Sequence, residues 1–235
     1  MEPDWKQAEP ALRHIRIKGN SGNRLVTVSG HAEHLRCIGI GTDAAVFVYD
    51  PLPGYAYKVY ADEALRKRDE EEQVYLALGH SPYFPVYYGK GDRYIVISLE
   101  QGPTLYDCLA QGIEIPRRVL EDVEEARRYA RSKGLNPRDI HLKNVLMQDG
   151  RAKLLDVSEY RKPGNDRRWE HLLLAYRLVY RWLKGRKLSV RQMEAVKNLY
   201  LALYGFGMKA SRLCGRFSRK RFARRQAPES GPEKD

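Results

Sequence analysis

The pattern of apolar and polar residues divides the chain into a strand-rich first half and a helix-rich second half. Residues 46–49 and 55–60 are short apolar runs, rich in valine and tyrosine, and a turn containing proline and glycine separates them. This arrangement predicts two antiparallel strands. The apolar run 94–99 predicts another strand, and residues 62–78 carry the apolar spacing of a single helix. The first half is therefore expected to form a sheet with one helix.

The second half is predicted to be helical apart from one hairpin. Apolar residues recur at helical spacing in four segments, Thr104 to Gln111, Pro116 to Lys133, Arg167 to Lys184 and Ser189 to Leu203. Gly134 and Gly185 follow two of these segments, where glycine commonly ends a helix. Apolar residues at 145–147 and 152–155 flank Asp149-Gly150, a strong signal for a β-hairpin. The fold class expected is α+β, with a sheet-rich part before a mainly helical part.

Three polar residues around this hairpin suggest chemistry. Asp139 and Asn144 lie five residues apart in the segment RDIHLKN, and Asp156 ends the second hairpin strand. Asp and Asn alone are common turn formers, but a hairpin would bring Asn144 and Asp156 to face one another. Together they could bind a hard cation such as magnesium through oxygen atoms. A further carboxylate that accepts a proton from an attacking hydroxyl would complete a phosphoryl-transfer site.

The first half contains matching residues for a nucleotide. The string GIGTDAAV, residues 39–46, places small residues between two strands, where the backbone can lie close over phosphates. The elements that follow are strand, turn and strand, whereas a dinucleotide-binding unit would need a helix there. Lys58 lies in the next strand within the pattern A-x-K, and its ammonium group could neutralise phosphates. Such a lysine needs a carboxylate to orient it.

Three consecutive glutamates, 70–72, offer that carboxylate on the predicted helix. Only one of them can point inward. We choose Glu71, because the apolar residues 74, 75 and 78 lie on its helical face. Glu72 is the alternative.

Taken in order, these elements resemble the eukaryotic-type protein-kinase superfamily. The resemblance covers roughly residues 35–205 and consists of G-x-G-x-x-A-x-V, A-x-K, a helical glutamate, R-D-x-x-x-x-N and a metal-binding aspartate. It implies a two-lobed fold, with an antiparallel sheet and one helix in the N-terminal lobe and a mainly helical C-terminal lobe. It also implies ATP and Mg²⁺ as cofactors and a protein serine or threonine hydroxyl as acceptor.

The resemblance assigns roles by matching position. Asp139 would be the catalytic base, with Lys58 and Glu71 clamping the phosphates and Asn144 and Asp156 binding magnesium. The remaining ATP-binding residues would be Gly39, Gly41, Thr42 and Ala44 in the phosphate loop, Val46, Ala56 and Leu146 around the adenine, and backbone groups near Ser98 and Glu100 in the hinge.

Several departures keep a second enzyme class open. The third glycine is Ala44, Pro137 precedes the Arg-Asp pair, and His141 stands where protein kinases usually carry lysine. Histidine there resembles aminoglycoside and other small-molecule phosphotransferases. A new helix is expected within about a dozen residues of Asp156, as in small prokaryotic and Rio-type kinase-like proteins, so no long activation loop fits. A third alternative is a nucleotide-binding pseudokinase scaffold, although the chain retains every catalytic residue type.

Composition is consistent with a compact cytoplasmic enzyme. The chain has 235 residues, 43% of them hydrophobic, and three cysteines with no metal-ligand spacing. We find no signal peptide or transmembrane segment in the sequence. The net charge of +12 is concentrated late, with eight Lys or Arg residues and no acid from Lys209 to Arg225. Such a run is often solvated, but it could bind an acidic partner, RNA or an anionic surface.

The expected organisation has four parts. Residues 1–34 form an N-terminal extension, 35–101 the N-lobe, 102–208 a minimal C-lobe, and 209–235 a basic tail. Within the extension, Leu12 to Ile17 and Leu25 to Val28 could pair as a hairpin that adds strands to the small lobe.

Overall fold

The computed structural model describes residues 3–22, 24–195 and 198. The chain forms two compact units, Met1–Lys187 and Leu188–Asp235. In the second unit residues 190–195 are helical, and the Ser189 hydroxyl caps this helix by accepting the Gln192 N–H. The remainder of the helix predicted to end at Leu203, and the whole basic run from Lys209 to Arg225, lie outside the described residues.

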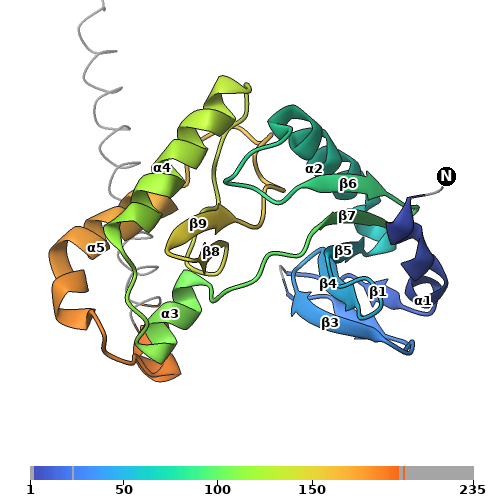
Figure 1. The fold of residues 1–235 in the computed structure, drawn as a ribbon, viewed down its shortest axis with the longest axis horizontal. Helices are drawn as coiled ribbons and strands as arrows, with labels where there is room; N and C mark the ends of the chain where they lie inside the picture. Colours follow the sequence, from blue (N-terminus) through green and yellow to red (C-terminus); the bar gives the residue numbers. More distant parts are fainter. Residues whose placement is uncertain (1–2, 23, 196–197, 199–235) are drawn as a thin grey trace, which may run out of the picture. The chain divides into compact units, whose positions relative to one another are not determined.

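The first unit contains a five-stranded antiparallel sheet (Figure 1). Its strands are β3 (Leu35–Ile40), β4 (Ala44–Tyr49), β5 (Tyr55–Tyr60), β6 (Tyr87–Lys90) and β7 (Tyr94–Ser98), in the order β3-β4-β5-β7-β6. The central strands β5 and β7 are buried along most of their length because both faces of the sheet are covered. The strands predicted for the first half are confirmed.

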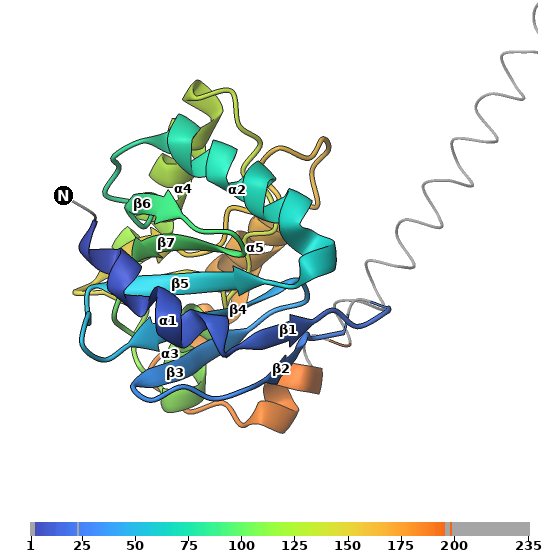
Figure 2. The same cartoon turned by 90° about the vertical axis from the view of Figure 1, so that its right-hand side faces the viewer.

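Different helices cover the two faces of this sheet (Figure 2). Successive side chains of a strand point to opposite faces, so Tyr57 and Lys58 of β5 face different neighbours. Lys58 contacts α2 (Leu65–Leu78), which follows a short 3₁₀ helix, Asp62–Ala64. Tyr57 donates its hydroxyl proton to the Trp5 carbonyl at 3.0 Å, on the face covered by the N-terminal helices.

The N-terminal segment differs from its prediction. Asp4–Ala8 is a 3₁₀ helix and α1 spans Glu9–Arg13, so Leu12 is helical and not part of a strand. A hairpin does form, but between β1 (Arg16–Lys18) and β2 (Thr27–Ser29), as a two-stranded sheet of its own. The prediction that the first strand of this hairpin begins at Leu12 was wrong. The physical reason is that Trp5, Ala8 and Leu12, spaced three and four residues apart, bury one helical face.

The helical half agrees with the predicted segments. Its elements are α3 (Leu105–Gln111), α4 (Arg117–Ser132), β8 (Val145–Gln148), β9 (Arg151–Leu154) and α5 (Arg168–Leu183). Thr104 and Asp107 form a capping box at the start of α3. Gly134 and Gly185 adopt φ angles of 75° and 71° just beyond α4 and α5, as glycines that end helices do. No helix in the described part of the chain is long and apolar enough to cross a lipid bilayer.

The predicted hairpin is confirmed and is fixed to α4. Asp149 and Gly150 both have positive φ, 49° and 73°, as a two-residue type I′ turn requires. Asp122 of α4 is 1% exposed and accepts two hydrogen bonds from Arg151, at 2.7 and 2.9 Å, and one from the Ala152 N–H. A buried carboxylate satisfied in this way holds the hairpin in one position.

Gly102 lies at the crossing between the sheet-rich and helical parts. Its φ is 132°, and a Cβ at this position would overlap the Met147 carbonyl oxygen of β8. Next to it, the Met147 N–H donates to the Pro103 carbonyl at 2.8 Å. The close approach of these two backbones requires glycine.

We expect Gly102→Ala to lower the free energy of unfolding by about 2 kcal/mol, because backbone strain adds to a steric overlap. Gly164→Ala is the matched control. Gly164 also has positive φ (86°), but no other atom lies within 4 Å of the position that an added methyl group would take. Urea unfolding of both variants measures the difference. Equal destabilisation would contradict the importance of the close approach at Gly102.

Candidate active site

Lys58 is the centre of a network of charged groups. Its ammonium nitrogen lies 2.8 and 2.7 Å from the two carboxylate oxygens of Glu71 and 3.3 Å from Oδ1 of Asp156. β5 places Lys58 between Val46 of β4 and Ile95 of β7, so its backbone is fixed on both sides. The network joins the sheet, α2 and the end of the hairpin. The choice of Glu71 as the partner of Lys58 is confirmed.

Burial and ion pairing act in opposite directions on the pKa values of this network. Glu71 is fully buried, which raises its pKa, and the Lys58 ammonium opposes that effect. The Tyr60 hydroxyl also donates to Glu71, at 2.6 Å. Burial alone would lower the pKa of Lys58, but the carboxylates of Asp156 and Glu71 raise it above the ordinary value. Glu72 instead contacts Tyr87 and Lys90 of β6, which explains why it is not the partner.

Asp156 and Asn144 lie at the two ends of the hairpin. The Leu155 N–H donates to the Asn144 carbonyl at 2.9 Å, which brings these ends together. Burial would raise the pKa of Asp156, but the Lys58 ammonium and the Ser158 N–H lower it to about 2. The Asn144 amide nitrogen donates to the Asp139 carbonyl at 3.1 Å, so its amide oxygen remains as an acceptor.

These two side chains fit a magnesium ion. An ionised carboxylate and an amide oxygen are hard ligands, and Mg²⁺ usually completes its coordination with water and nucleotide phosphates. Among the described residues, no group of three or more His, Cys, Asp or Glu could hold a metal ion by itself. A site made by Asn144 and Asp156 would therefore depend on the nucleotide for the other ligands.

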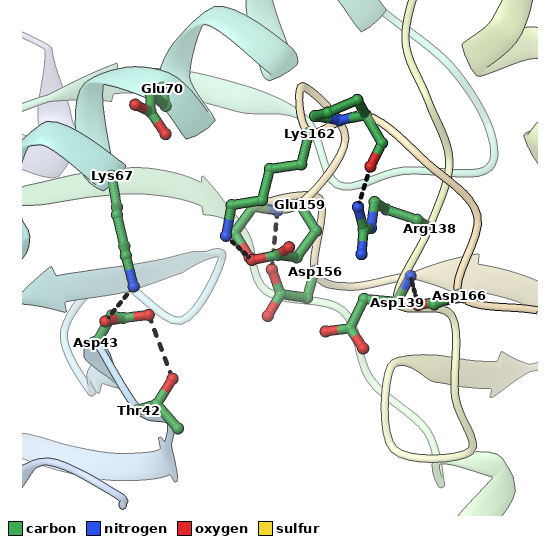
Figure 3. A network of polar contacts seen from close by, with 12 residues as sticks. Thr42, Asp43, Lys67, Glu70, Arg138, Asp139, Asp156, Glu159, Lys162 and Asp166 are labelled. Carbon is green, nitrogen blue, oxygen red and sulfur yellow. Dashed lines mark hydrogen bonds and ion pairs between the residues drawn. The ribbon is translucent and has the colours of Figure 1, made fainter. Parts of the chain in front are cut away.

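Asp139 is held in an uncommon backbone conformation. Its φ is 57°, in the left-handed region, and its N–H donates to Oδ2 of Asp166 at 2.8 Å. Burial raises the pKa of Asp139, and the neighbouring Arg168 partly opposes this shift. In Figure 3 the carboxylates of Asp139 and Asp156 point into the same space. A carboxylate with a raised pKa, facing a charged site, is suited to accept a proton.

Two residues beside Asp139 had no role in the sequence interpretation. Asp166 precedes α5 and accepts both the Asp139 N–H and, at 3.1 Å, the Arg168 N–H. Arg168, the first residue of α5, contacts Oδ1 of Asp139 through its guanidinium group. The acid immediately before a predicted helix was an available signal for Asp166, because such residues often bond the first free N–H groups. No sequence pattern connects Arg168 with Asp139, 29 residues earlier.

His141 stands in the turn between Asp139 and Asn144. Its Nδ1 accepts the Lys143 N–H at 3.2 Å, so this nitrogen carries no proton. Burial lowers the pKa of His141, and Asp139 partly opposes that effect. Burial therefore favours the neutral imidazole.

The glycine-containing loop between β3 and β4 is a tight turn. The Gly41 N–H donates to the Ala44 carbonyl at 2.8 Å, and the Gly41 carbonyl accepts the Val26 N–H of the N-terminal extension. Asp43, at the tip, pairs with Lys67 of α2 at 2.6 Å and accepts the Thr42 hydroxyl at 3.2 Å (Figure 3). The loop is therefore fastened on both sides, and the Gly41 N–H is already used.

The residues assigned to the adenine lie on facing elements. Ala56 of β5 and Leu146 of β8 are buried, Val46 of β4 is half-buried, and Gly39 lies opposite Val46 in the sheet. Leu146 also pairs with Thr104, just beyond the crossing.

Ser98 and Glu100, the residues expected in the hinge, take part in a series of hydrogen bonds and an ion pair. The Ser98 N–H donates to the Val86 carbonyl at 2.8 Å, so the sheet already uses it. The Ser98 hydroxyl donates to the Glu100 carboxylate at 2.5 Å, and Lys153 of β9 approaches the same carboxylate at 3.3 Å. The carboxylate of Glu100 thus links the hinge to the hairpin, and only its backbone can serve a nucleotide.

We expect Glu71→Gln to lower the free energy of unfolding by about 3 kcal/mol, because it removes the charge that compensates a buried ammonium group. Glu72→Gln is the matched control and should cost about 1 kcal/mol or less, since its partner Lys90 is exposed. Urea unfolding of the two variants gives both values. A larger loss for Glu72→Gln would show that the buried network does not hold α2.

Comparison with known proteins supports a kinase relationship. No family model matches the chain. A protein of Bacillus subtilis (strain 168) named "Putative serine/threonine-protein kinase YrzF" is 34% identical over 173 residues, which are 73% of this chain and 80% of that protein. A solved structure of WbdD with the kinase inhibitor LY294002 matches 56% of this chain and 33% of its own, with 18% identity and a TM-score of 0.41. The extent and identity of the match to the Bacillus protein show that this chain belongs to the protein-kinase-like family.

Proposed function

We propose that this protein transfers the γ-phosphate of ATP to a serine or threonine hydroxyl of a protein substrate. The observation that carries the proposal is the convergence of Lys58, Glu71 and Asp156 in one ion network beside Asp139. Phosphoryl transfer depends mainly on positioning and on neutralising charge. A buried lysine held by two carboxylates is ready to neutralise phosphates without reorganisation.

Asp139 acts as the base in this proposal. The hydroxyl oxygen of the acceptor forms a bond to the γ-phosphorus, the bond from that phosphorus to the bridging oxygen breaks, and Asp139 takes the hydroxyl proton. Burial raises the pKa of Asp139, which makes it a better proton acceptor than an exposed aspartate. The hydrogen bond from its N–H to Asp166 holds the backbone of Asp139 in place.

Asn144 and Asp156 hold magnesium in this proposal. Such an ion would offset the negative charge of the phosphates. Asp156 stays ionised because its pKa is about 2. Lys58 holds Asp156 and Glu71 at fixed positions. The magnesium ion held by Asp156 and the ammonium group of Lys58 would therefore bind the triphosphate at the same time.

The nucleotide would lie between the glycine-containing loop and the hairpin. Because the Gly41 N–H is already used, the tip at Thr42 and Asp43 would cover the phosphates, with Lys67 offsetting the Asp43 charge. Val46, Ala56 and Leu146 offer apolar contacts to the adenine, and backbone groups near Ser98 and Glu100, other than the Ser98 N–H, would bind its edge. Free backbone groups and apolar walls are the usual parts of such sites.

A small-molecule acceptor is the second candidate. Only residues 157–167 separate Asp156 from α5, so the predicted short connection is confirmed and leaves little chain to support an extended peptide. The protein acceptor is supported by the name of the Bacillus relative. Separating labelled protein from labelled metabolites distinguishes the two acceptors.

We expect Asp139→Asn to lower kcat by about a hundred-fold or more, because an amide cannot accept the hydroxyl proton. Affinity for ATP should change little. The measurement is transfer of label from γ-labelled ATP and magnesium to protein and metabolite fractions of a lysate. Asp149→Asn is the control, since asparagine is also tolerated at the left-handed position of the type I′ turn. Equal activity in wild type and Asp139→Asn would overturn the assignment of the base.

A further inference from the structure

Arg168 is paired with the carboxylate of Asp139, which the proposed reaction needs as its base. Its guanidinium group contacts Oδ1 of Asp139, and its own backbone N–H is fixed by Asp166. Asp166 also fixes the Asp139 N–H, so a single carboxylate sets the distance between the first turn of α5 and the catalytic loop. The arginine side chain is 48% exposed and can therefore reorient. The guanidinium group also lies near Asp166, with its Nε 3.7 Å from Oδ2 of that carboxylate.

Several neighbouring cations have partners other than Asp139. Lys58 pairs with Glu71 and Asp156. In the catalytic loop and the segment after Asp156, Lys143 lies over the Tyr106 ring, Lys162 pairs with Glu159, and Arg138 donates to the Pro163 carbonyl. The side chains of Arg161 and Arg167, in the same segment, form no ion pair with Asp139. His141 is neutral when its Nδ1 accepts a hydrogen bond. Among the described residues, Arg168 is the cation paired with Asp139.

Phosphoryl transfer needs positive charge where the γ-phosphate reacts. Charge spreads over the oxygens of the transferred group, and an arginine that contacts them lowers the barrier. Guanidinium groups suit this task because their planar donors can bind two phosphate oxygens at once. A cation that stayed on Asp139 would also weaken it as a base. A residue that leaves Asp139 for the phosphate would serve both needs.

We propose that Arg168 binds the γ-phosphate of ATP. Without nucleotide it pairs with Asp139, and on ATP binding it moves to the terminal phosphate and frees Asp139 to accept the acceptor's proton. This inference rests on the proposed function and adds a catalytic residue to it. Because Asp166 holds the Asp139 backbone independently, loss of the Arg168 side chain leaves the base in place.

The test compares two nucleotides that differ in the terminal phosphate. Isothermal titration of the full chain with a non-hydrolysable ATP analogue (AMP-PNP) and with ADP, both with magnesium, gives an affinity ratio for each variant. For Arg168→Ala we expect affinity for AMP-PNP to fall by about ten-fold, the loss of one charge-assisted contact, while affinity for ADP stays unchanged. Arg168→Lys should recover part of the affinity for AMP-PNP. Arg131→Ala, which removes one exposed charge from the last turn of α4, should behave as wild type.

Turnover separates this role from an inhibitory one. If Arg168 stabilises the transferred phosphoryl group, Arg168→Ala also lowers kcat for label transfer. A rise in kcat would show that the pair with Asp139 only blocks the base. An equal change in affinity for both nucleotides would indicate a structural role for Arg168. No change in affinity would show that Arg168 does not reach the phosphate. Each of these results would overturn the inference about Arg168 but not the proposed function. A wild-type protein that binds neither nucleotide would overturn the proposed function as well.

Discussion

The buried ammonium of Lys58 is the interaction on which the site depends. It joins a strand of the sheet, the helix α2 and the end of the hairpin through Glu71 and Asp156. Removing a lysine and a glutamate from water is costly, so these groups are stable only while each compensates the other. The arrangement therefore requires all three elements to be in place at once. It also keeps charge ready for a phosphate, which is what a phosphotransferase needs from its scaffold.

The second group of constraints acts on the loop that contains Asp139 and Asn144. The hairpin is fixed to α4 by the buried Asp122, and the Leu155 N–H closes its open end on Asn144. Asp166 fixes the backbone of Asp139 from the start of α5. These are mostly hydrogen bonds to carboxylates, which specify positions more narrowly than apolar packing does. Groups other than the Arg168 side chain hold the loop, so the movement that we propose for this arginine would leave Asp139 in place.

Much of the fold was predictable because its signals are local. The Asp149-Gly150 turn, the glycines that end α4 and α5, and the apolar spacing of the helices each depend on a few consecutive residues. The pairing of Lys58 with Glu71 followed from one helical face. The N-terminal helices could have been found from the spacing of Trp5, Ala8 and Leu12. Because these helices are short, the same apolar residues also fitted a strand. The contacts of Arg168 and Asp166 with Asp139 could not be predicted, because only the tertiary fold brings residues so far apart in sequence together.

The most direct measurement is the affinity of wild type and Lys58→Met for ATP with magnesium, by isothermal titration. Methionine keeps the length and apolar stem of lysine but removes the charge, while Asp139, the proposed base, is untouched. We predict that wild type binds ATP and that Lys58→Met loses affinity by about ten-fold or more. The reason is that the substitution removes a buried positive charge that would contact the phosphates. Equal affinities for a folded Lys58→Met variant would contradict the claim that this ion network is the nucleotide site.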